Sequence, residues 1–263
     1  MADSDDEPLT LSSHALDALK EFYTERDARA KRFEELQAEA EERAKAGAEG
    51  GAAAASGAAS GLKYPLSMET FGEDWNESQF WYSDETASVL ARQLLDGATA
   101  ETRIAVVSAP SVFVALKNIL ASQPPEAPTP QLTLLEHDNR FGVFPEFVFY
   151  DFMQPVKLPA SLKSSFDRLI VDPPFLSEDC QTKAALTVRW MAKAASADTR
   201  LILCTGERME SLARRLYKSF GLQTTDYEVV HARGLSNEFY CYSNFECGDW
   251  KWKAEDGTGG EAR

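Results

Sequence analysis

The feature that most constrains the fold of this chain is a predicted buried strand that ends abruptly at two prolines. Residues 166–171 have the length of a buried strand and close on Leu-Ile-Val, and Asp172-Pro173-Pro174-Phe175 follows them directly. Two consecutive prolines allow neither a continued strand ladder nor an immediate helix. We therefore predict a stiff loop at the carboxyl end of a strand, which is where open α/β sheets bind their ligands.

The groups on this loop suit an amine. The Asp172 carboxylate and the Pro173 carbonyl can accept hydrogen bonds from the N–H groups of a flat or cationic amine. The Phe175 ring can cover the same amine through apolar or cation–π contact. Methyl transfer to nitrogen requires an amine held in this way. The simpler interpretation is a rigid turn between a strand and a helix that carries no chemistry.

Strands and helices are predicted to alternate through the middle of the chain. The apolar patterns predict strands at 103–107, 132–136, 147–150, 166–171, 201–204, 227–231 and 239–245, and helices at 84–95, 112–121, 178–195 and 208–220. This alternation predicts an α/β fold, with a parallel sheet that carries helices on both faces. The last two strands have no long helix between them, so we expect an antiparallel edge.

The two ends of the chain differ in composition from its middle. A helix is predicted from His14, either as a partner-binding arm or as a solvated helix whose first turns pack on the domain. Residues 47–61 are almost entirely Ala, Gly and Ser and predict a flexible linker. We therefore predict an acidic tail and helix at 1–46, a linker at 47–62, a globular domain at 63–250 and a flexible tail at 251–263.

The charge and the cysteines limit the possible partners. The formal net charge is −15, divided between residues 1–61 (−7) and the remainder (−8), so a basic or neutral partner is favoured and nucleic acid is not expected. The four cysteines include no Cys-x-x-Cys pair and the three histidines do not cluster, so neither a metal site nor a disulfide framework is expected. Without an apolar signal or spanning segment, we expect no membrane contact and a cytoplasmic location.

Polar groups follow each of the first three strands of the predicted sheet. Because the carboxyl ends of parallel strands meet at one edge, a nucleoside could lie across them with its reactive group toward Asp172. The groups are Ser108 and Ser111 at a helix start, Glu136 and Asp138 placed for ribose hydroxyls, and Asp151 with Phe152 placed for adenine. Each has a simpler interpretation. Ser111 would be a helix cap, Asp138 an ion-pair partner of Arg140, and Asp151 a turn former before Pro155.

Several uncommon segments together resemble one known family. They are Ser-Gln-Phe-Trp-Tyr-Ser at 78–83 with Glu85-Thr86-Ala87, Val-Ser-Ala-Pro-Ser-Val at 107–112, Phe-Val-Phe-Tyr-Asp at 147–151, Asp-Pro-Pro-Phe-Leu-Ser-Glu at 172–178 and Asn-Glu-Phe at 237–239. The stretch from about residue 75 to residue 245 resembles the eukaryotic lysine methyltransferases of translation elongation factor 1-alpha, first labelled as N6-adenine DNA methyltransferases. The resemblance implies a seven-strand class I methyltransferase sheet with an N-terminal helical extension, S-adenosylmethionine as cofactor and elongation factor 1-alpha as protein substrate.

The first strand departs from the wider methyltransferase superfamily, because no glycine follows it. Glycine usually lets the backbone approach the amino-acid part of the cofactor, but here the loop is Ser108-Ala109-Pro110-Ser111. The elongation-factor family shares this departure. We expect the aromatic loop at 80–83 to help hold the cofactor, through Trp81 and, less strongly, Ser83.

The proposed chemistry is transfer of a methyl group to a lysine ε-nitrogen. A carboxylate favours the ammonium over the amine, so Asp172 and the Pro173 carbonyl are expected to orient the nitrogen, with Phe175, Trp81 or Tyr82 as walls. The sequence indicates no dedicated base. Three alternatives stay open at this point: an adenine-N6 methyltransferase of nucleic acid, a glutamine-amide methyltransferase, and a methyltransferase-like module that only binds.

Overall fold

The computed structural model describes residues 12–49, 62, 64–73, 79–235 and 238–254. The chain divides into two compact units, Met1–Leu62 with Glu69–Gly72, and Lys63–Met68 with Glu73–Arg263. In the first unit α1 (Ser13–Glu49) is a single helix that extends three residues past the predicted boundary at 46, and the Phe33 ring lies 6.1 Å from the Phe71 ring. The predicted linker and tails lie mostly outside the described residues, so these domain boundaries stay predictions.

The second unit is built on one seven-stranded sheet of order β3-β2-β1-β4-β5-β7-β6. Its strands are β1 (Arg103–Val107), β2 (Gln131–Glu136), β3 (Phe147–Phe149), β4 (Arg168–Val171), β5 (Arg200–Gly206), β6 (Gln223–Glu228) and β7 (Phe239–Ser243). The first five pair in parallel, and β7 pairs antiparallel with both β5 and β6. The predicted parallel sheet with an antiparallel edge is confirmed, and the fold is that of a seven-strand class I methyltransferase.

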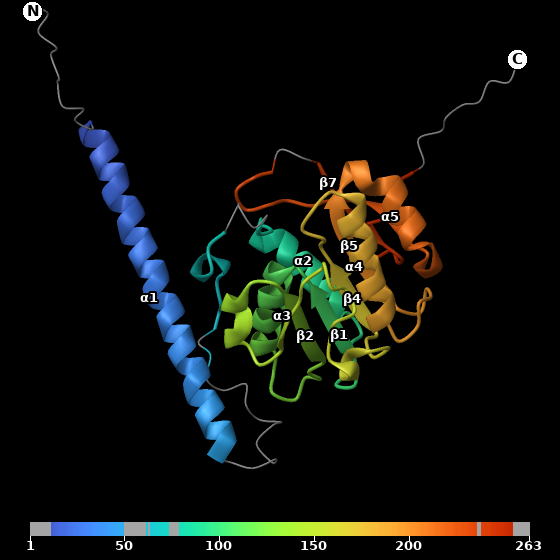
Figure 1. Ribbon diagram of the computed structural model, residues 1–263, viewed down its shortest axis with the longest axis horizontal. Coiled ribbons are helices and arrows are strands. Elements are labelled where there is room, and N and C mark those ends of the chain that lie inside the picture. Colours follow the sequence, from blue (N-terminus) through green and yellow to red (C-terminus); the bar gives the residue numbers. More distant parts are fainter. Residues whose placement is uncertain (1–11, 50–61, 63, 74–78, 236–237, 255–263) are drawn as a thin grey trace, which may run out of the picture. The chain divides into compact units, whose positions relative to one another are not determined.

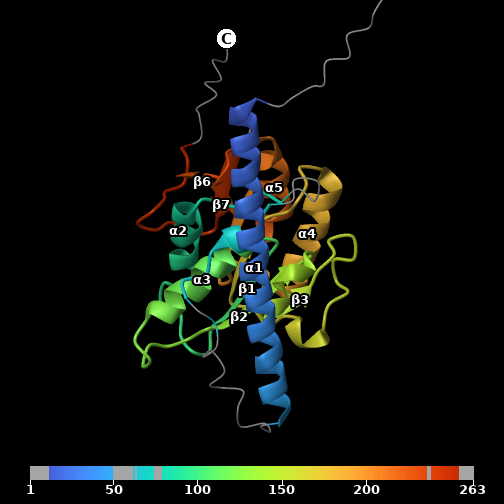
Figure 2. The ribbon, with the colours of Figure 1, turned by 90° about the vertical axis from the view of Figure 1, so that its left-hand side faces the viewer.

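Helices cover both faces of this sheet. They are α2 (Asp84–Leu95), α3 (Pro110–Ser122), α4 (Glu178–Met191) and α5 (Glu210–Leu216). Figures 1 and 2 show α2 and α3 on one face and α4 and α5 on the other. Since both faces are covered, the last four residues of β1 and the last three of β4 are buried, as expected for central parallel strands.

Three predicted elements differ from the structure by more than two residues at one end or both. The helix predicted at 178–195 ends at Met191, because Ala192 becomes extended and bridges Phe166, which lies just outside β4. The helix predicted at 208–220 is α5 with short 3-10 turns at Glu207–Met209 and Lys218–Phe220 on either side.

The strand predicted at 227–231 was placed too late. β6 is Gln223–Glu228, and the apolar pair that follows it leaves the sheet. There the Val230 carbonyl accepts a hydrogen bond from the Ser83 N–H (2.9 Å), and His231 bridges Tyr82. The apolar character of this segment therefore reflects pairing with the loop before α2.

Candidate active site

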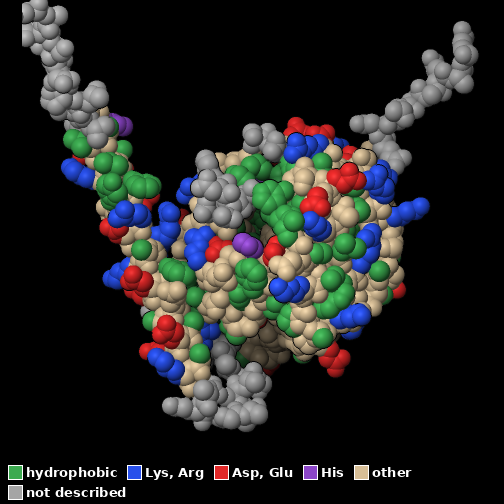
Figure 3. Space-filling view, in the orientation of Figure 1, with side chains coloured by type: hydrophobic (Ala, Val, Ile, Leu, Met, Phe, Trp, Pro, Cys, Tyr) green, Lys and Arg blue, Asp and Glu red, His purple; other side chains and the backbone are tan. Residues whose placement is uncertain are grey.

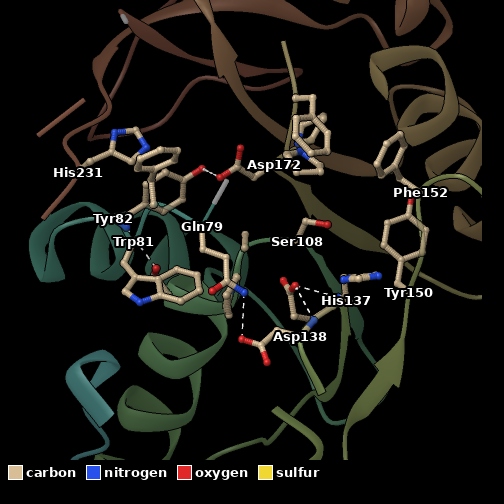
Figure 4. Close-up of a pocket in the computed structure, with 18 of the residues that line it drawn as sticks. Gln79, Trp81, Tyr82, Ser108, His137, Asp138, Tyr150, Phe152, Asp172 and His231 are labelled. Atoms are coloured by element: carbon tan, nitrogen blue, oxygen red, sulfur yellow. Dashed lines mark hydrogen bonds between the residues drawn. The ribbon is translucent and has the colours of Figure 1, made fainter. Parts of the chain in front are cut away.

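A cavity of about 680 Å³ opens where the loops after β1, β2, β3 and β4 meet. The segment before α2 and the loop between β6 and β7 complete its wall. All of the predicted site residues except Ser83 line it: Trp81, Ser108, Ser111, Glu136, Asp138, Asp151, Phe152, Asp172, Pro173 and Phe175. The topology therefore brings these residues to one place, and Figure 4 shows side chains from the different loops around the cavity.

Asp172 stands at the end of β4, directly beside β1. Its N–H donates to the Val107 carbonyl (3.0 Å), which fixes its backbone at the rim of the sheet. The Tyr82 hydroxyl donates to Oδ2 of Asp172. Burial raises the pKa of Asp172 to about 8, with a further upward contribution from the charge of Glu136, while the hydrogen bond from Tyr82 acts in the opposite direction.

The remainder of the 172–175 loop is held between the sheet and α4. Pro173 is buried, and Phe175 keeps 42% of its surface exposed with its ring 5.6 Å from the Phe152 ring. The buried Gln181 side chain, in the first turns of α4, donates from Nε2 to the Phe175 carbonyl (3.2 Å). This places an exposed ring beside a fixed carboxylate at the cavity wall.

The glycine-free loop after β1 makes the backbone turn that glycine would usually make. Ser108 has φ of 55°, in the left-handed region that side chains seldom enter. Ser111 does not cap α3, because the cap position is Ala109 and has no side-chain hydrogen bond. Instead the buried Ser111 Oγ accepts from the Tyr82 N–H (3.2 Å), which ties this loop to the segment before α2.

The two carboxylates at and just after the end of β2 have pKa values shifted in opposite directions. Burial raises the pKa of Glu136 to about 7, against hydrogen bonds to its Oε1 from the N–H groups of Asp138 (3.2 Å) and His137 (2.8 Å). For Asp138, burial alone would raise the pKa, but hydrogen bonds from Arg140 and Gln79 lower it overall. Arg140 and Asp138 form an ion pair of 2.6 Å, so the simpler interpretation of Asp138 describes its contacts correctly.

Asp151 also makes the contacts of a turn former. Its carboxylate accepts from Met153 N–H (2.8 Å) and from Gln154 Nε2 (3.0 Å), and the bond from Gln154 lowers its pKa most. It nevertheless lines the cavity, and the Phe152 ring beside it does too. Ser83, by contrast, lies outside the lining and caps α2, accepting from Thr86 N–H (3.2 Å).

Three further residues contribute to this site through contacts that the sequence analysis did not predict. Tyr82 bonds Asp172, Gln79 bonds Asp138 (2.9 Å), and His231 lies 5.1 Å from the Tyr82 ring, all as cavity-lining side chains. Burial lowers the pKa of His231 to about 4, although the charge of Glu73 opposes this. The aromatic run 80–83 was the only signal, and it indicated a wall rather than a bond to Asp172.

The described ranges of the chain contain neither a metal cluster nor a membrane-spanning helix. Within them, no cluster of three or more His, Cys, Asp and Glu side chains has the arrangement of a metal site. No helix among these residues combines the length and apolarity that a membrane crossing needs.

The seven-strand sheet, with an Asp-Pro-Pro-Phe loop over a cavity at its carboxyl edge, defines a class I methyltransferase. The sequence model of the family described as "Probable N6-adenine methyltransferase" matches residues 73–247. The chain is 40% identical to the protein-lysine N-methyltransferase EFM5 of Saccharomyces cerevisiae, over 92% of this chain and 94% of that protein. It is 38% identical to EEF1A lysine methyltransferase 1 of Gallus gallus, over 94% of this chain and 99% of that protein. The chain belongs to this family of protein-lysine N-methyltransferases.

Proposed function

We propose that this chain transfers a methyl group from S-adenosylmethionine to a lysine of translation elongation factor 1-alpha in the cytoplasm. The observation that carries the proposal is that the 172–175 loop and the ends of β1, β2 and β3 line one cavity. The names of the relatives support the substrate, since several are EEF1A lysine methyltransferases. A translation factor acts in the cytoplasm, and the free thiols of all four cysteines agree with a reducing compartment. The catalytic unit would be residues 63–250.

The cavity fits a nucleoside cofactor. Its volume of about 680 Å³ lies within the range of about 300–1,000 Å³ usual for small-molecule sites. Ser108, through its left-handed backbone, turns the loop after β1 as glycine does elsewhere, so the backbone there can approach the amino-acid part of the cofactor. Ser111 would act with it by holding the segment that contains Trp81, whose ring forms part of the wall.

The nucleoside part would lie along the ends of β2 and β3. Glu136 would accept the ribose hydroxyls through Oε2, because backbone N–H groups of the described residues bond its Oε1 alone. Asp138 is held by Arg140 and Gln79, so its proposed part is to fix the loop and add charge beside the ribose. Asp151 and Phe152 would face the adenine. When bound, S-adenosylmethionine supplies a methyl group carried by a sulfonium.

The target lysine would enter beside the loop that follows β4. Its free amine at pH 7 costs roughly 4.6 kcal/mol, because the reference pKa is 10.4. Asp172 and the Pro173 carbonyl would accept the N–H hydrogens and so direct the lone pair, while Phe175 covers the chain of methylenes. The ammonium proton would pass to water before transfer. The lysine nitrogen would then bond to the methyl carbon as the carbon–sulfur bond breaks, and the electron pair of that bond would stay on sulfur.

One observation favours the adenine-N6 alternative: the family that matches this chain is described as a probable N6-adenine methyltransferase. Its target is uncharged and planar and could use the same loop. A base in a duplex, however, must be flipped while the phosphates are held by basic groups. Figure 3 shows Lys and Arg interspersed with Asp and Glu over the domain surface, and the net charge of the chain is −15.

One experiment separates these substrates. The chain is incubated with methyl-labelled S-adenosylmethionine and, in separate tubes, with elongation factor 1-alpha, single-stranded DNA and duplex DNA, and the products are mapped by mass spectrometry. We expect label on one or few lysines of the elongation factor, lost when the mapped lysine is changed to arginine. Label on adenine, or none on the protein, would refute the proposal.

A further inference from the structure

We propose that Tyr82 is a positioning residue for methyl transfer, holding the Asp172 carboxylate in its working orientation through the phenolic hydroxyl. The inference deepens the proposed function and rests on it. Tyr82 lies 90 residues before Asp172 in the chain, and the two side chains point toward one another at the cavity (Figure 4). The hydroxyl donates to Oδ2, and within the described part of the chain no group bonds Oδ1. One carboxylate oxygen is therefore occupied and the other is left to accept from a substrate amine.

Tyr82 is itself held firmly, so it can fix its partner. Its side chain is only 3% exposed, and its N–H donates to Ser111 Oγ. The next residue, Ser83, donates its N–H to the Val230 carbonyl (2.9 Å), which anchors the backbone on the other side. The His231 ring lies 5.1 Å from the Tyr82 ring at 58°. A hydroxyl carried by such a side chain has little orientational freedom left to lose when substrate binds.

Tyr82 also connects the part of the site proposed to bind the cofactor with the part proposed to hold the amine. Ser111 lies in the first turn of α3, directly after the β1 loop where the cofactor is proposed to bind, whereas Asp172 belongs to the loop that would hold the amine. Tyr82 bonds the first through its backbone and the second through its side chain. The distance between the methyl donor and the amine acceptor depends on this connection, and misplacement by about 1 Å can cost about a hundredfold in rate.

The hydroxyl also affects the charge of Asp172. The titratable groups that interact with that carboxylate are Tyr82 before α2, Glu136 at the end of β2, Cys180 on α4 and Cys204 on β5. Arg208 after β5 and His231 after β6 line the same cavity. Burial and Glu136 both favour the protonated carboxyl, and the hydrogen bond from Tyr82 favours the ionised one. Removing the hydroxyl should therefore move the titration of Asp172 to higher pH.

The test is Tyr82→Phe, which keeps the ring and removes only the hydroxyl. We expect affinity for S-adenosylmethionine within about threefold of wild type and kcat at pH 7 lowered about ten- to hundredfold, the loss for a hydrogen bond to a charged group. The acid limb of the kcat profile should move up by about one pH unit, so that part of the loss is recovered near pH 9. Tyr217→Phe is the matched control, because Tyr217 is fully buried and its hydroxyl has no partner within the described chain.

The outcomes separate positioning from support of the fold. A loss that is equal at every pH and accompanied by weaker cofactor binding or a lower Tm would overturn the proposal, and so would wild-type kcat. The titration of Asp172, followed by carboxyl ¹³C NMR in both proteins without substrate, should move upward in Tyr82→Phe. An unchanged titration overturns the proposed contact whatever the substrate, whereas an inactive wild type with a moved titration refutes the proposed function alone.

Discussion

Opposing effects act on the protonation state of the Asp172 carboxylate. In the proposed function it accepts hydrogen bonds from an amine, yet burial and the neighbouring Glu136 favour its protonated form and raise its pKa to about 8. Tyr82 opposes this by donating to Oδ2. Because an ionised Asp172 would stabilise an ammonium, the role we propose for it is to orient the substrate nitrogen and not to produce the free amine.

A prediction about a single residue also follows for Glu136, which would bind the ribose of the cofactor. Its pKa is about 7, and ribose hydroxyls that donate to it favour the ionised form. Affinity for S-adenosylmethionine should therefore rise about tenfold between pH 6 and pH 8 through this group. Glu136→Gln should weaken binding about ten- to hundredfold and remove that part of the pH dependence.

Isothermal titration calorimetry at several pH values measures this directly. Titration of the cofactor's own groups is the same in both proteins, so the difference between their profiles isolates Glu136. Parallel profiles for wild type and variant would contradict the assignment.

At the scale of elements, α4 supports the loop that precedes it. Gln181 is fully buried, and its Nε2 donates to the Phe175 carbonyl (3.2 Å) and to Thr205 Oγ1 (3.0 Å). We expect Gln181→Met, which keeps the volume, to lower kcat several-fold with unchanged cofactor affinity, because the Phe175 carbonyl loses its donor. Thr205→Val removes the other bond of the same amide and should leave kcat unchanged. Steady-state kinetics on both variants checks this, and equal effects would contradict it.

The sequence predicted the elements around the site well, because their signals are local. An apolar run followed by Asp-Pro-Pro-Phe determines a strand and its end, and β1 to β5 all overlap their predicted ranges. The limits that were wrong depend on distant partners. Helix α4 stops where Ala192 bridges Phe166, and Val230 leaves the sheet to bond Ser83. Local propensity does not include these contacts.

In the site too, the sequence predicted what depends on local signals and missed what depends on contacts between distant segments. Strand ends brought Ser108, Glu136 and Asp172 to one cavity, as the topology of a parallel sheet requires. The bond from Tyr82 to Asp172 spans 90 residues and depends on how the segment before α2 is folded, so no spacing pattern could indicate it. Ser83 was predicted to help hold the cofactor because it belongs to the loop at 80–83, but its side chain caps α2.

At the scale of the whole molecule, charge and architecture select the class of substrate. A net charge of −15 repels a phosphate backbone and attracts a basic surface, so a protein lysine is the more accessible amine. Fold and family define the methyltransferase class, while the 172–175 loop determines where the amine would be held.

The proposed part of the 172–175 loop is to orient a lysine and not to bind the cofactor. The most direct measurement compares Asp172→Ala with wild type, and with Asp198→Ala as a control at an exposed carboxylate, in cofactor binding and in methylation of elongation factor 1-alpha. We predict a Kd for S-adenosylmethionine within about threefold of wild type and a rate of methyl transfer lowered at least about a hundredfold. Methylation by Asp172→Ala at the wild-type rate would contradict the account.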